Sequence, residues 1–189
     1  MPLYEIHHST PLLPHQLSAI AKAITNLHCS TFSAPSSFVN IVFHPATTSE
    51  TTIGPAIYVG GEQQHQTNYI IGHLRPRPSK PRDTLNTLVE GLTAVWNEVV
   101  RARPLDASAQ TTTATTSGRL DDARGLHNVF LMEDIAAGAE QGFVLPVAGR
   151  DAQWAEQNMR EFERRAGLGD RSMGRLVGEV RMGFGRSKL

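Results

Sequence analysis

Hydrophobic and polar positions along the first part of the chain predict three elements. Residues 3–8 alternate with the two-residue period of a β-strand. Pro14 is placed to open a helix, and apolar residues then recur at three- and four-residue spacing to about His28. Residues 36–44 are rich in β-branched and aromatic side chains, which is typical of a central strand. The order is strand, helix, strand, and a crossover helix of this length favours parallel strands.

The same order returns in the second half. Residues 56–59 predict a short strand, and residues 69–74 predict a longer one. A helix with apolar positions from 85 to 99 follows, and then a strand over residues 128–132. We therefore expect an α+β fold, in which two consecutive β-α-β units form a mixed four-stranded sheet with two helices on one face.

The chain divides by pattern into a main domain and an extension. Residues 1–147 hold the two units, with a small, polar, Thr-rich stretch at 103–120 that we interpret as a flexible insertion. Residues 148–189 predict a C-terminal helical appendage, whose role is either packing surface or a stalk. The first helix of the appendage has three candidate anchors: Trp154, Met159 and Phe162.

Composition narrows the classes of partner. The chain has 189 residues, enough for a real core, and 18 basic against 18 acidic residues give zero formal charge, which argues against nucleic acid as the main partner. The single Cys29 excludes an internal disulfide framework and a zinc-type cysteine cluster. No apolar run is long enough to span a bilayer, so we expect no membrane partner. The N-terminus lacks the basic and apolar regions of a secretory signal. Five histidines lack metal-ligating spacing, so we expect no metal or cofactor: His7, His8, His44, His65 and His73.

The C-terminal tripeptide Ser187-Lys188-Leu189 is the peroxisomal import address. Gly183 and Gly185 before it favour a loose tail, which the address needs in order to be read. We therefore expect a peroxisomal protein that binds the import receptor through these three residues.

Pro2 directly follows the initiator methionine and opens the first strand. Methionine is usually trimmed before a small residue, and trimming would leave Pro2 with a free secondary amine. An α-amino group titrates near pH 8, and burial beside cations lowers that pKa. Such an amine would be neutral at pH 7 and could act as a general base. The other interpretation is an ordinary N-terminus that happens to begin Met-Pro.

Three further stretches carry a resemblance to a known family. They are Ala21-Lys22-Ala23-Ile24-Thr25-Asn26-Leu27-His28, Leu74-Arg75-Pro76-Arg77 and Glu140-Gln141-Gly142, and they follow the Met-Pro strand in order. Together they resemble the tautomerase superfamily, in particular cis-3-chloroacrylic acid dehalogenase and the fungal-type oxalocrotonate tautomerases. The resemblance covers residues 2 to about 147, with gaps at the insertion.

The resemblance implies a role for each matched residue. Pro2 matches the catalytic amine, and His28 matches the histidine that hydrogen-bonds substrate or positions water. Glu140 matches the carboxylate that activates water. Arg75 and Arg77 match the pair that holds the substrate carboxylate, and they would also lower the pKa of the proline. Family members form symmetric trimers, so we expect a homotrimer.

Phe130 departs from the family pattern. It stands where the family has an active-site tyrosine, so it keeps the apolar wall and loses the hydroxyl donor. This substrate-site residue shifts the expectation from dehalogenase towards tautomerase or hydratase. Tyr58 or Tyr4 could supply another hydroxyl, and Phe130 could reach a neighbouring subunit's pocket.

Three hypotheses follow. The first is a cofactor-free tautomerase acting on small 2-oxo, enol or unsaturated carboxylic acids, with hydration or weak dehalogenation of acrylic or acetylenic acids as the alternative. The second is a binding module, because residues 75–81 have the spacing of an SH3 ligand, which requires Arg75 and Arg77 to be exposed. The third is an inactive member that retains Met1, in which the Pro2 nitrogen is an amide and cannot titrate.

Overall fold

The computed structural model describes most of the chain. The described ranges are 1–46, 57–64, 66–77, 82–101 and 120–184. The predicted insertion, apart from its last residue, and the Ser187-Lys188-Leu189 signal lie outside these ranges.

Four strands form the central sheet in the order β2-β1-β5-β6. They are β1 (Leu3–His8), β2 (Asn40–Pro45), β5 (Asn68–His73) and β6 (Asn128–Met132). The β1–β2 and β5–β6 pairs are parallel, and the central β1–β5 pair is antiparallel. The predicted mixed sheet of two β-α-β units is confirmed.

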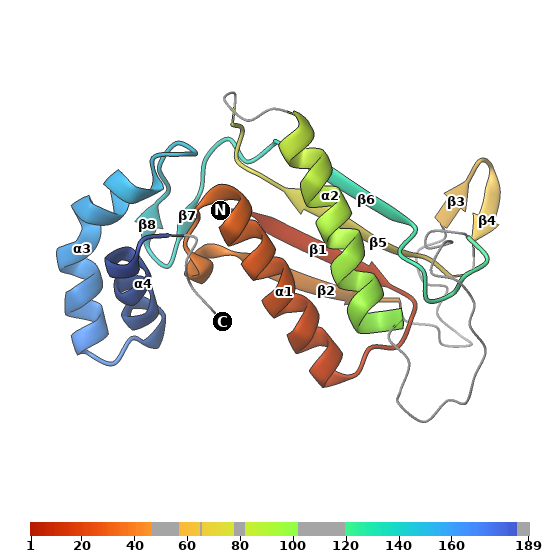
Figure 1. The fold of residues 1–189 in the computed structure, drawn as a ribbon, viewed down its shortest axis with the longest axis horizontal. Helices are drawn as coiled ribbons and strands as arrows, with labels where there is room; N and C mark the ends of the chain where they lie inside the picture. Colours follow the sequence, from red (N-terminus) through yellow and green to blue (C-terminus); the bar gives the residue numbers. More distant parts are fainter. Residues whose placement is uncertain (47–56, 65, 78–81, 102–119, 185–189) are drawn as a thin grey trace.

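Two helices cover one face of this sheet (Figure 1). They are α1 (Pro14–Phe32) and α2 (Arg82–Trp96), and a π-helical turn continues α2 over Asn97–Arg101. Pro14 occupies the first turn of α1, and the Gln16 side chain accepts a hydrogen bond from the Leu13 backbone N–H at 3.0 Å. The helix runs past the predicted end at His28 and stops where Ser33 adopts a left-handed φ of 50°.

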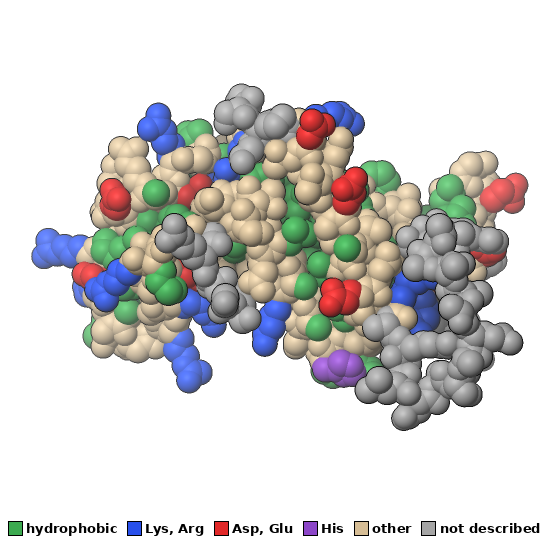
Figure 2. All heavy atoms as spheres, viewed as in Figure 1, with side chains coloured by type: hydrophobic (Ala, Val, Ile, Leu, Met, Phe, Trp, Pro, Cys, Tyr) green, Lys and Arg blue, Asp and Glu red, His purple; other side chains and the backbone are tan. Residues whose placement is uncertain are grey.

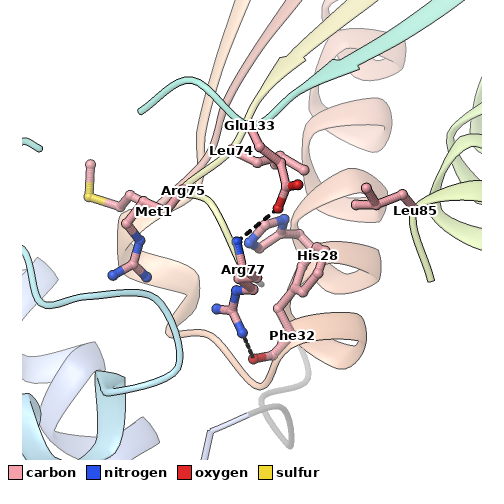
Figure 3. Close-up of a pocket in the computed structure, with 8 residues that line it drawn as sticks. All are labelled: Met1, His28, Phe32, Leu74, Arg75, Arg77, Leu85 and Glu133. Atoms are coloured by element: carbon pink, nitrogen blue, oxygen red, sulfur yellow. Dashed lines mark hydrogen bonds between the residues drawn. The ribbon is translucent and has the colours of Figure 1, made fainter. Parts of the chain in front are cut away.

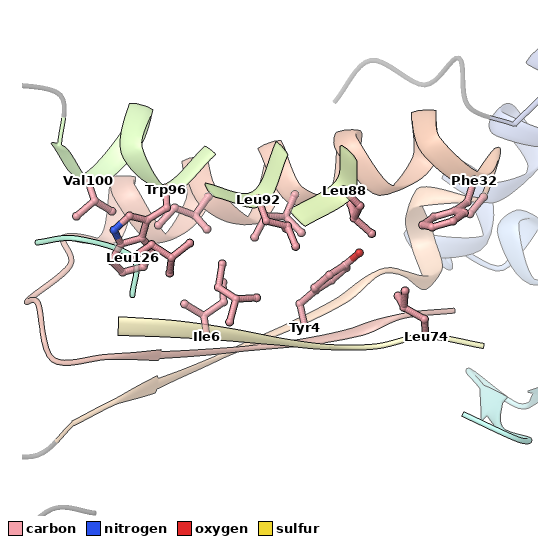
Figure 4. Close-up of a cluster of buried hydrophobic side chains, with 13 residues drawn as sticks. Tyr4, Ile6, Phe32, Leu74, Leu88, Leu92, Trp96, Val100 and Leu126 are labelled. Atoms are coloured by element: carbon pink, nitrogen blue, oxygen red, sulfur yellow. The ribbon is translucent and has the colours of Figure 1, made fainter. Parts of the chain in front are cut away.

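The main core lies between the sheet and these helices (Figure 4). Tyr4 and Ile6 of β1 are fully buried there. Leu3, Glu5 and His7, which alternate with them along the strand, face the opposite, open side of the sheet. The helices contribute a row of buried residues: Ile20, Ile24, Leu88, Leu92, Trp96 and Val100.

Gly72 allows Tyr4 to take its position. It is the β5 partner of Tyr4, and a Cβ at Gly72 would lie 3.0 Å from the Tyr4 ring and 2.6 Å from Leu131. The tyrosine ring can therefore lie across the neighbouring strand, which directs its hydroxyl toward α1.

Two predicted strands differ from the structure. The predicted strand 36–44 begins instead as a 3-10 turn, Ser36–Phe38, because Phe38 packs away from the main core in a second hydrophobic cluster. The predicted short strand 56–59 corresponds to β3 (Ile57–Val59), which pairs with β4 (Glu62–Gln64). This hairpin lies outside the four-stranded sheet.

The C-terminal segment packs beside the start of β1 (Figure 1). A small hairpin, β7 (Ala139–Glu140) and β8 (Phe143–Val144), leads into α3 (Asp151–Gly167) and α4 (Arg171–Met182). Trp154, Phe162 and Met173 form a second cluster with Phe38, and Met1 packs against it. The predicted anchors Trp154 and Phe162 are buried, and Met159 packs against the same cluster from a partly buried position.

A buried carboxylate ties this segment to the main domain. Glu179 of α4 is 3% exposed and accepts a hydrogen bond of 2.7 Å from the Ser36 backbone N–H. The Ser36 hydroxyl donates a second bond to the same carboxylate. The extension is therefore packing surface rather than a stalk over the described residues. The predicted boundary at 147/148 stays a prediction.

The face seen in Figure 2 carries Lys and Arg side chains around α3 and α4, with Asp and Glu side chains among them and over α2. Positive charge is therefore interspersed with negative charge on this face, in keeping with the zero formal charge. Among the described helices, none combines the length and apolar character needed to cross a bilayer.

Candidate active site

The N-terminal amine lies in a buried, electropositive setting at the start of β1. Burial lowers the pKa of the Met1 amine, Arg75 and Arg77 lower it further, and together they bring it from 8.0 to about 5 despite the opposing charges of Asp151 and Glu140. Pro2 itself is buried, and its carbonyl accepts a 3.2 Å hydrogen bond from the Asn40 backbone N–H. The strand therefore fixes the N-terminus among charged groups.

Two small cavities flank Met1. The first, shown in Figure 3, is lined by Met1, His28, Phe32, Leu74, Arg75, Arg77, Leu85 and Glu133. The second is lined by Pro2, Phe38 and Asp151 among others, and it shares Met1 and Arg75 with the first. Each leaves about 10 Å³, room for about one water molecule. With Met1 in place, neither cavity can admit a small organic acid.

Arg75 is held by the C-terminal segment. It is 8% exposed, and its Nη2 donates to Asp151 Oδ1 at 2.5 Å while Nη1 donates to the Pro146 carbonyl at 2.6 Å. Its Nε is buried and has no hydrogen-bond partner among the residues that the structure describes. One donor of the guanidinium is thus unused.

Arg77 is held less tightly. Its Nη2 lies 3.6 Å from Asp151 Oδ2, its Nη1 donates to the Phe32 carbonyl at 3.5 Å, and its guanidinium lies 4.9 Å from the centre of the Phe32 ring. Its backbone N–H donates to Glu133 Oε1 at 2.9 Å. Long contacts at both terminal nitrogens leave this guanidinium freer than that of Arg75.

The two arginine side chains are 7% and 13% exposed. The SH3-ligand hypothesis required both to be accessible, and it is wrong for this reason. Arg75 lines both described cavities and Arg77 lines the first, and their role in holding a substrate carboxylate stays a prediction.

His28 is a neutral imidazole in this setting. Its Nδ1 lies 2.9 Å from the Tyr4 hydroxyl in a buried hydrogen bond. Burial lowers the pKa of His28 well below 6.5, and the N-terminal amine and both arginines lower it further. The adjacent Cys29 is no nucleophile, because burial raises its thiol pKa to about 12. His28 can therefore exchange hydrogen bonds at the pocket, but it does not carry charge at neutral pH.

Glu140 joins the site from β7. Its Oε2 accepts a 3.1 Å hydrogen bond from Asn40 Nδ2, and Asn40 also donates the backbone bond that holds Pro2. Burial raises the pKa of Glu140, while the Asn40 bond and the N-terminal amine oppose that rise. Asn40 thus fixes the N-terminal strand and the carboxylate in one local arrangement.

Phe130 lies away from this pocket. It is 54% exposed on the open face of β6, opposite the helices, and is absent from the described lining of both cavities. Of the two tyrosines considered as substitutes, Tyr58 is 60% exposed on the β3–β4 hairpin, whereas Tyr4 is buried against His28. Of these two, Tyr4 is the one that contacts a residue of the pocket, through its hydrogen bond with His28.

Two acidic residues of the site were missed by sequence reasoning. Glu133 directly follows β6, and its position at a strand end is a signal that could have drawn attention to it. Asp151 begins α3 in the segment that the resemblance did not cover. No local pattern links Asp151 to Arg75, since the contact depends on how the extension folds back.

Comparison with family models supports the resemblance to the tautomerase superfamily. A family model described as "Putative oxalocrotonate tautomerase enzyme" matches residues 1–159. No curated protein matched the chain. The matched range continues past residue 147 into α3, and it includes Asp151.

Several solved structures share the fold. A member of the cis-3-chloroacrylic acid dehalogenase family aligns with a TM-score of 0.56 and 16% identity, over 84% of this chain and 96% of that one. A probable enzyme from the thermophilic fungus Aspergillus fumigatus aligns at 0.53 and 20%, over 85% and 94%. A fused 4-OT that forms a symmetric trimer aligns at 0.50 and 15%, over 78% and 99%.

Proposed function

Because the chain belongs to the oxalocrotonate tautomerase enzyme family whose model it matches, we propose that it is a cofactor-independent tautomerase acting on small 2-oxo or enol carboxylic acids. Removal of Met1 makes Pro2 the N-terminus, and its amine is the acid/base. One observation carries the proposal. Burial, with Arg75 and Arg77 nearby, lowers the pKa of the Met1 amine from 8.0 to about 5, and we expect the same surroundings to lower the pKa of a Pro2 amine and so favour its neutral form.

The proton transfer needs no other reagent. The neutral Pro2 amine takes the proton from the enol hydroxyl as the oxygen becomes a carbonyl. The resulting ammonium then delivers a proton to the adjacent carbon, which regenerates the free amine and completes ketonisation. Arg77 and Arg75 hold the substrate carboxylate, and neutral His28 exchanges a hydrogen bond with the substrate oxygen.

Met1 prevents this chemistry in two ways. As long as it is attached, the Pro2 nitrogen is an amide without a basic lone pair. Its side chain also lines both small cavities, so removing it enlarges the space in front of Pro2 and Arg75. One processing step would thus supply both the base and the room for a substrate.

Asp151 competes with the substrate for the arginines. Its carboxylate lies 2.5 Å from Arg75 and 3.6 Å from Arg77, as an incoming carboxylate would. A substrate can displace it, or it can bind to the unused Arg75 Nε and the loosely held Arg77. In either case Asp151 sets how tightly small anions bind.

The proposal is tested by ketonisation of phenylenolpyruvate, followed by ultraviolet absorbance on protein whose mass shows that Met1 is absent. Pro2→Ala is expected to lower kcat/KM by about 100-fold or more, the usual contribution of a general base. Pro14→Ala, at the exposed start of α1, is the matched control and should retain activity. Equal rates for Pro2→Ala and the parent would eliminate the amine base.

Hydration of an acetylenic or 3-substituted acrylic acid is the second candidate. Glu140 favours it, because a carboxylate of raised pKa near the N-terminal amine can accept a proton from water. In this reaction the oxygen of water adds to the multiple bond as Glu140 takes its proton, and the ammonium form of Pro2, which is the minor form at pH 7, supplies the proton to carbon. The proton on Glu140 then returns to Pro2, so hydration should be fastest at a lower pH than ketonisation. Glu140→Gln should abolish hydration and leave ketonisation largely intact. Loss of both reactions together would contradict this division of roles.

A homotrimer is proposed as the assembly. The fused 4-OT neighbour is a symmetric trimer, and the open sheet face of this chain exposes Val42, Phe130 and Met132. In such a trimer Phe130 would reach a neighbour's pocket. Sedimentation equilibrium should give three times the chain mass, and a stable monomer would contradict the assembly.

Peroxisomal import through Ser187-Lys188-Leu189 remains a proposal that rests on the sequence alone. An amino-terminal fluorescent fusion should colocalise with a peroxisomal marker, and a fusion lacking these three residues should not. Equal distribution of the two fusions would contradict it.

A further inference from the structure

The open face of the sheet carries a cluster of histidines around one carboxylate. Glu5 of β1 projects there, and three imidazoles approach it from three strands. The distances are 2.8 Å from His44 Nε2 and 3.8 Å from His7 Nε2 to Glu5 Oε2, and 3.3 Å from His73 Nε2 to Glu5 Oε1. We refer to Glu5, His7, His44 and His73 as the histidine cluster.

Strand register produces this cluster. His7 and His44 are direct partners in the parallel β1–β2 pair, and their rings stack with centroids 4.4 Å apart. His7 also stacks on Tyr69, its partner in β5, at 4.4 Å. The three histidines are far apart in sequence, so spacing along the chain gave no metal-ligating pattern. The pairing of the strands is what brings them together.

One ring of the cluster is oriented as in a metal site. His73 Nδ1 lies 2.7 Å from Asp134 Oδ2. An ionised carboxylate only accepts hydrogen bonds, so the contact with Asp134 places a proton on Nδ1 and leaves Nε2 as the ring nitrogen that faces Glu5. Nε2 lies 3.3 Å from Glu5 Oε1, and either a proton on Nε2 or a metal cation between the two atoms would make this contact favourable. Asp134 thus takes the part of the carboxylate that orients a metal-bound histidine.

A second ring directs a shielded nitrogen at the same carboxylate. His44 Nε2 is shielded from solvent and makes no hydrogen bond with any residue in the described ranges, although it lies 2.8 Å from Glu5 Oε2. Imidazole nitrogens gathered at one carboxylate form a donor set of the kind that Zn²⁺ binds.

We propose that the histidine cluster binds a divalent first-row transition metal such as Zn²⁺, with Glu5, His7 and His44 as ligands, His73 as the fourth, and Asp134 orienting His73. One ligand atom from each of the first three lies within 4.8 Å of the others. Metal–ligand distances of about 2.0–2.2 Å require these atoms to draw together. In the single chain the cluster's side chains are 23–41% exposed, which gives the rings room to turn before the proposed trimer covers the open face. Nitrogen donors favour such a metal over Mg²⁺ or Ca²⁺.

The site is independent of the proposed tautomerase chemistry. Tyr4 and Ile6 face the core between the sheet and the helices, and Glu5 and His7 face the other way. A metal on the open face would lie across the sheet from the pocket that holds His28. It would join β2, β1 and β5 and so stabilise the sheet at its centre.

The test is Zn²⁺ and Co²⁺ binding to the full, tag-free chain in the assembly that it forms. Competition with a chromophoric chelator gives affinity, and Co²⁺ absorbance reports nitrogen and oxygen ligation. We expect one ion per chain. Glu5→Gln and His44→Ala should each weaken binding by about 100-fold or more, and Asp134→Asn by about 10-fold, the range for lost ligand and orienting groups.

His15→Ala is the matched control, because His15 is an exposed histidine on α1 outside the cluster. It should bind Zn²⁺ as the parent does, and so should Pro2→Ala. Circular dichroism of each variant establishes that it is folded. Parent affinity equal to that of folded His44→Ala, or absence of the Co²⁺ bands in the parent, would overturn the metal site. Neither result would bear on Pro2.

Discussion

Two carboxylates of this molecule are surrounded by basic side chains, and the surroundings differ in kind. Asp151 is buried between Arg75 and Arg77, while Glu5 lies among three imidazoles on the open sheet face. Arginine keeps its charge at any physiological pH, so the two guanidiniums attract an anion whether Asp151 or a substrate supplies the carboxylate. Histidine can lose its proton and present a lone pair. The first arrangement suits binding of an anion, and the second suits binding of a metal cation.

Removing the buried aspartate should have the largest effect. Asp151→Ala leaves Arg75 as an uncompensated buried charge, which is expected to cost about 3–5 kcal/mol of unfolding free energy. Asp134→Ala removes a surface partner of His73 and should cost under about 1 kcal/mol. Urea unfolding measures both. A small organic acid should bind the arginines that Asp151 leaves free, and so should stabilise Asp151→Ala more than the parent. Equal losses of unfolding free energy in Asp151→Ala and Asp134→Ala would contradict the difference between a buried and a surface ion pair.

Loss of the freer arginine should act on substrate binding. Arg77→Ala removes a charge-assisted contact worth about 1.5–3 kcal/mol, so KM for phenylenolpyruvate should rise by about 10- to 150-fold. His44→Ala, on the other face, should leave ketonisation within about 2-fold, since it contacts neither pocket nor N-terminus. Steady-state kinetics on both variants provides the check. A comparable loss in His44→Ala would mean that the two faces are coupled.

The pH dependence should follow the N-terminal amine. Burial and the two arginines, which lower the pKa of the Met1 amine, should act on the Pro2 amine in the same direction, so it should be protonated, and inactive as a base, only below a pKa that lies well under 8.0. kcat/KM for ketonisation should therefore rise about tenfold per pH unit below that value and be level near pH 7. A profile that keeps rising to pH 8, the ordinary range of an α-amino group, would contradict the electropositive setting.

The smallest effect is expected at Phe130. Phe130→Tyr adds a hydroxyl at the aligned family position, and one hydrogen bond of about 0.5–1.5 kcal/mol corresponds to a 2- to 10-fold gain. The gain should appear in hydration or dehalogenation and not in ketonisation. It should also require assembly, since Phe130 lies outside the described pocket of its own chain. Equal gain in an assembly-deficient variant would contradict a neighbour's pocket.

The sequence contained enough to predict the sheet and its two helices, because their apolar periods are strong and local. The family resemblance also predicted that Pro2, His28, Arg75 and Arg77 share one site. Phe38 was placed on a strand because its β-branched neighbours favour one, but burial against Trp154 decided otherwise.

What could not be predicted depends on tertiary folding. Asp151 reaches Arg75 only because α3 packs back on the start of β1. The histidine cluster depends on strand register, which pairs His7 with His44 and sets His73 beside Glu5. Such contacts join residues that are far apart in the sequence, so no local sequence motif contains both partners.

The central claim is that the N-terminal site holds a neutral amine, and the most direct measurement is an NMR titration of the Pro2 nitrogen. It requires ¹⁵N-proline-labelled protein whose mass shows that Met1 is absent. We predict a single titration well below the ordinary value of 8.0, because the burial and the two arginines that lower the pKa of the Met1 amine also surround Pro2. A Pro2 amine that titrates at about pH 8 or above would contradict the account.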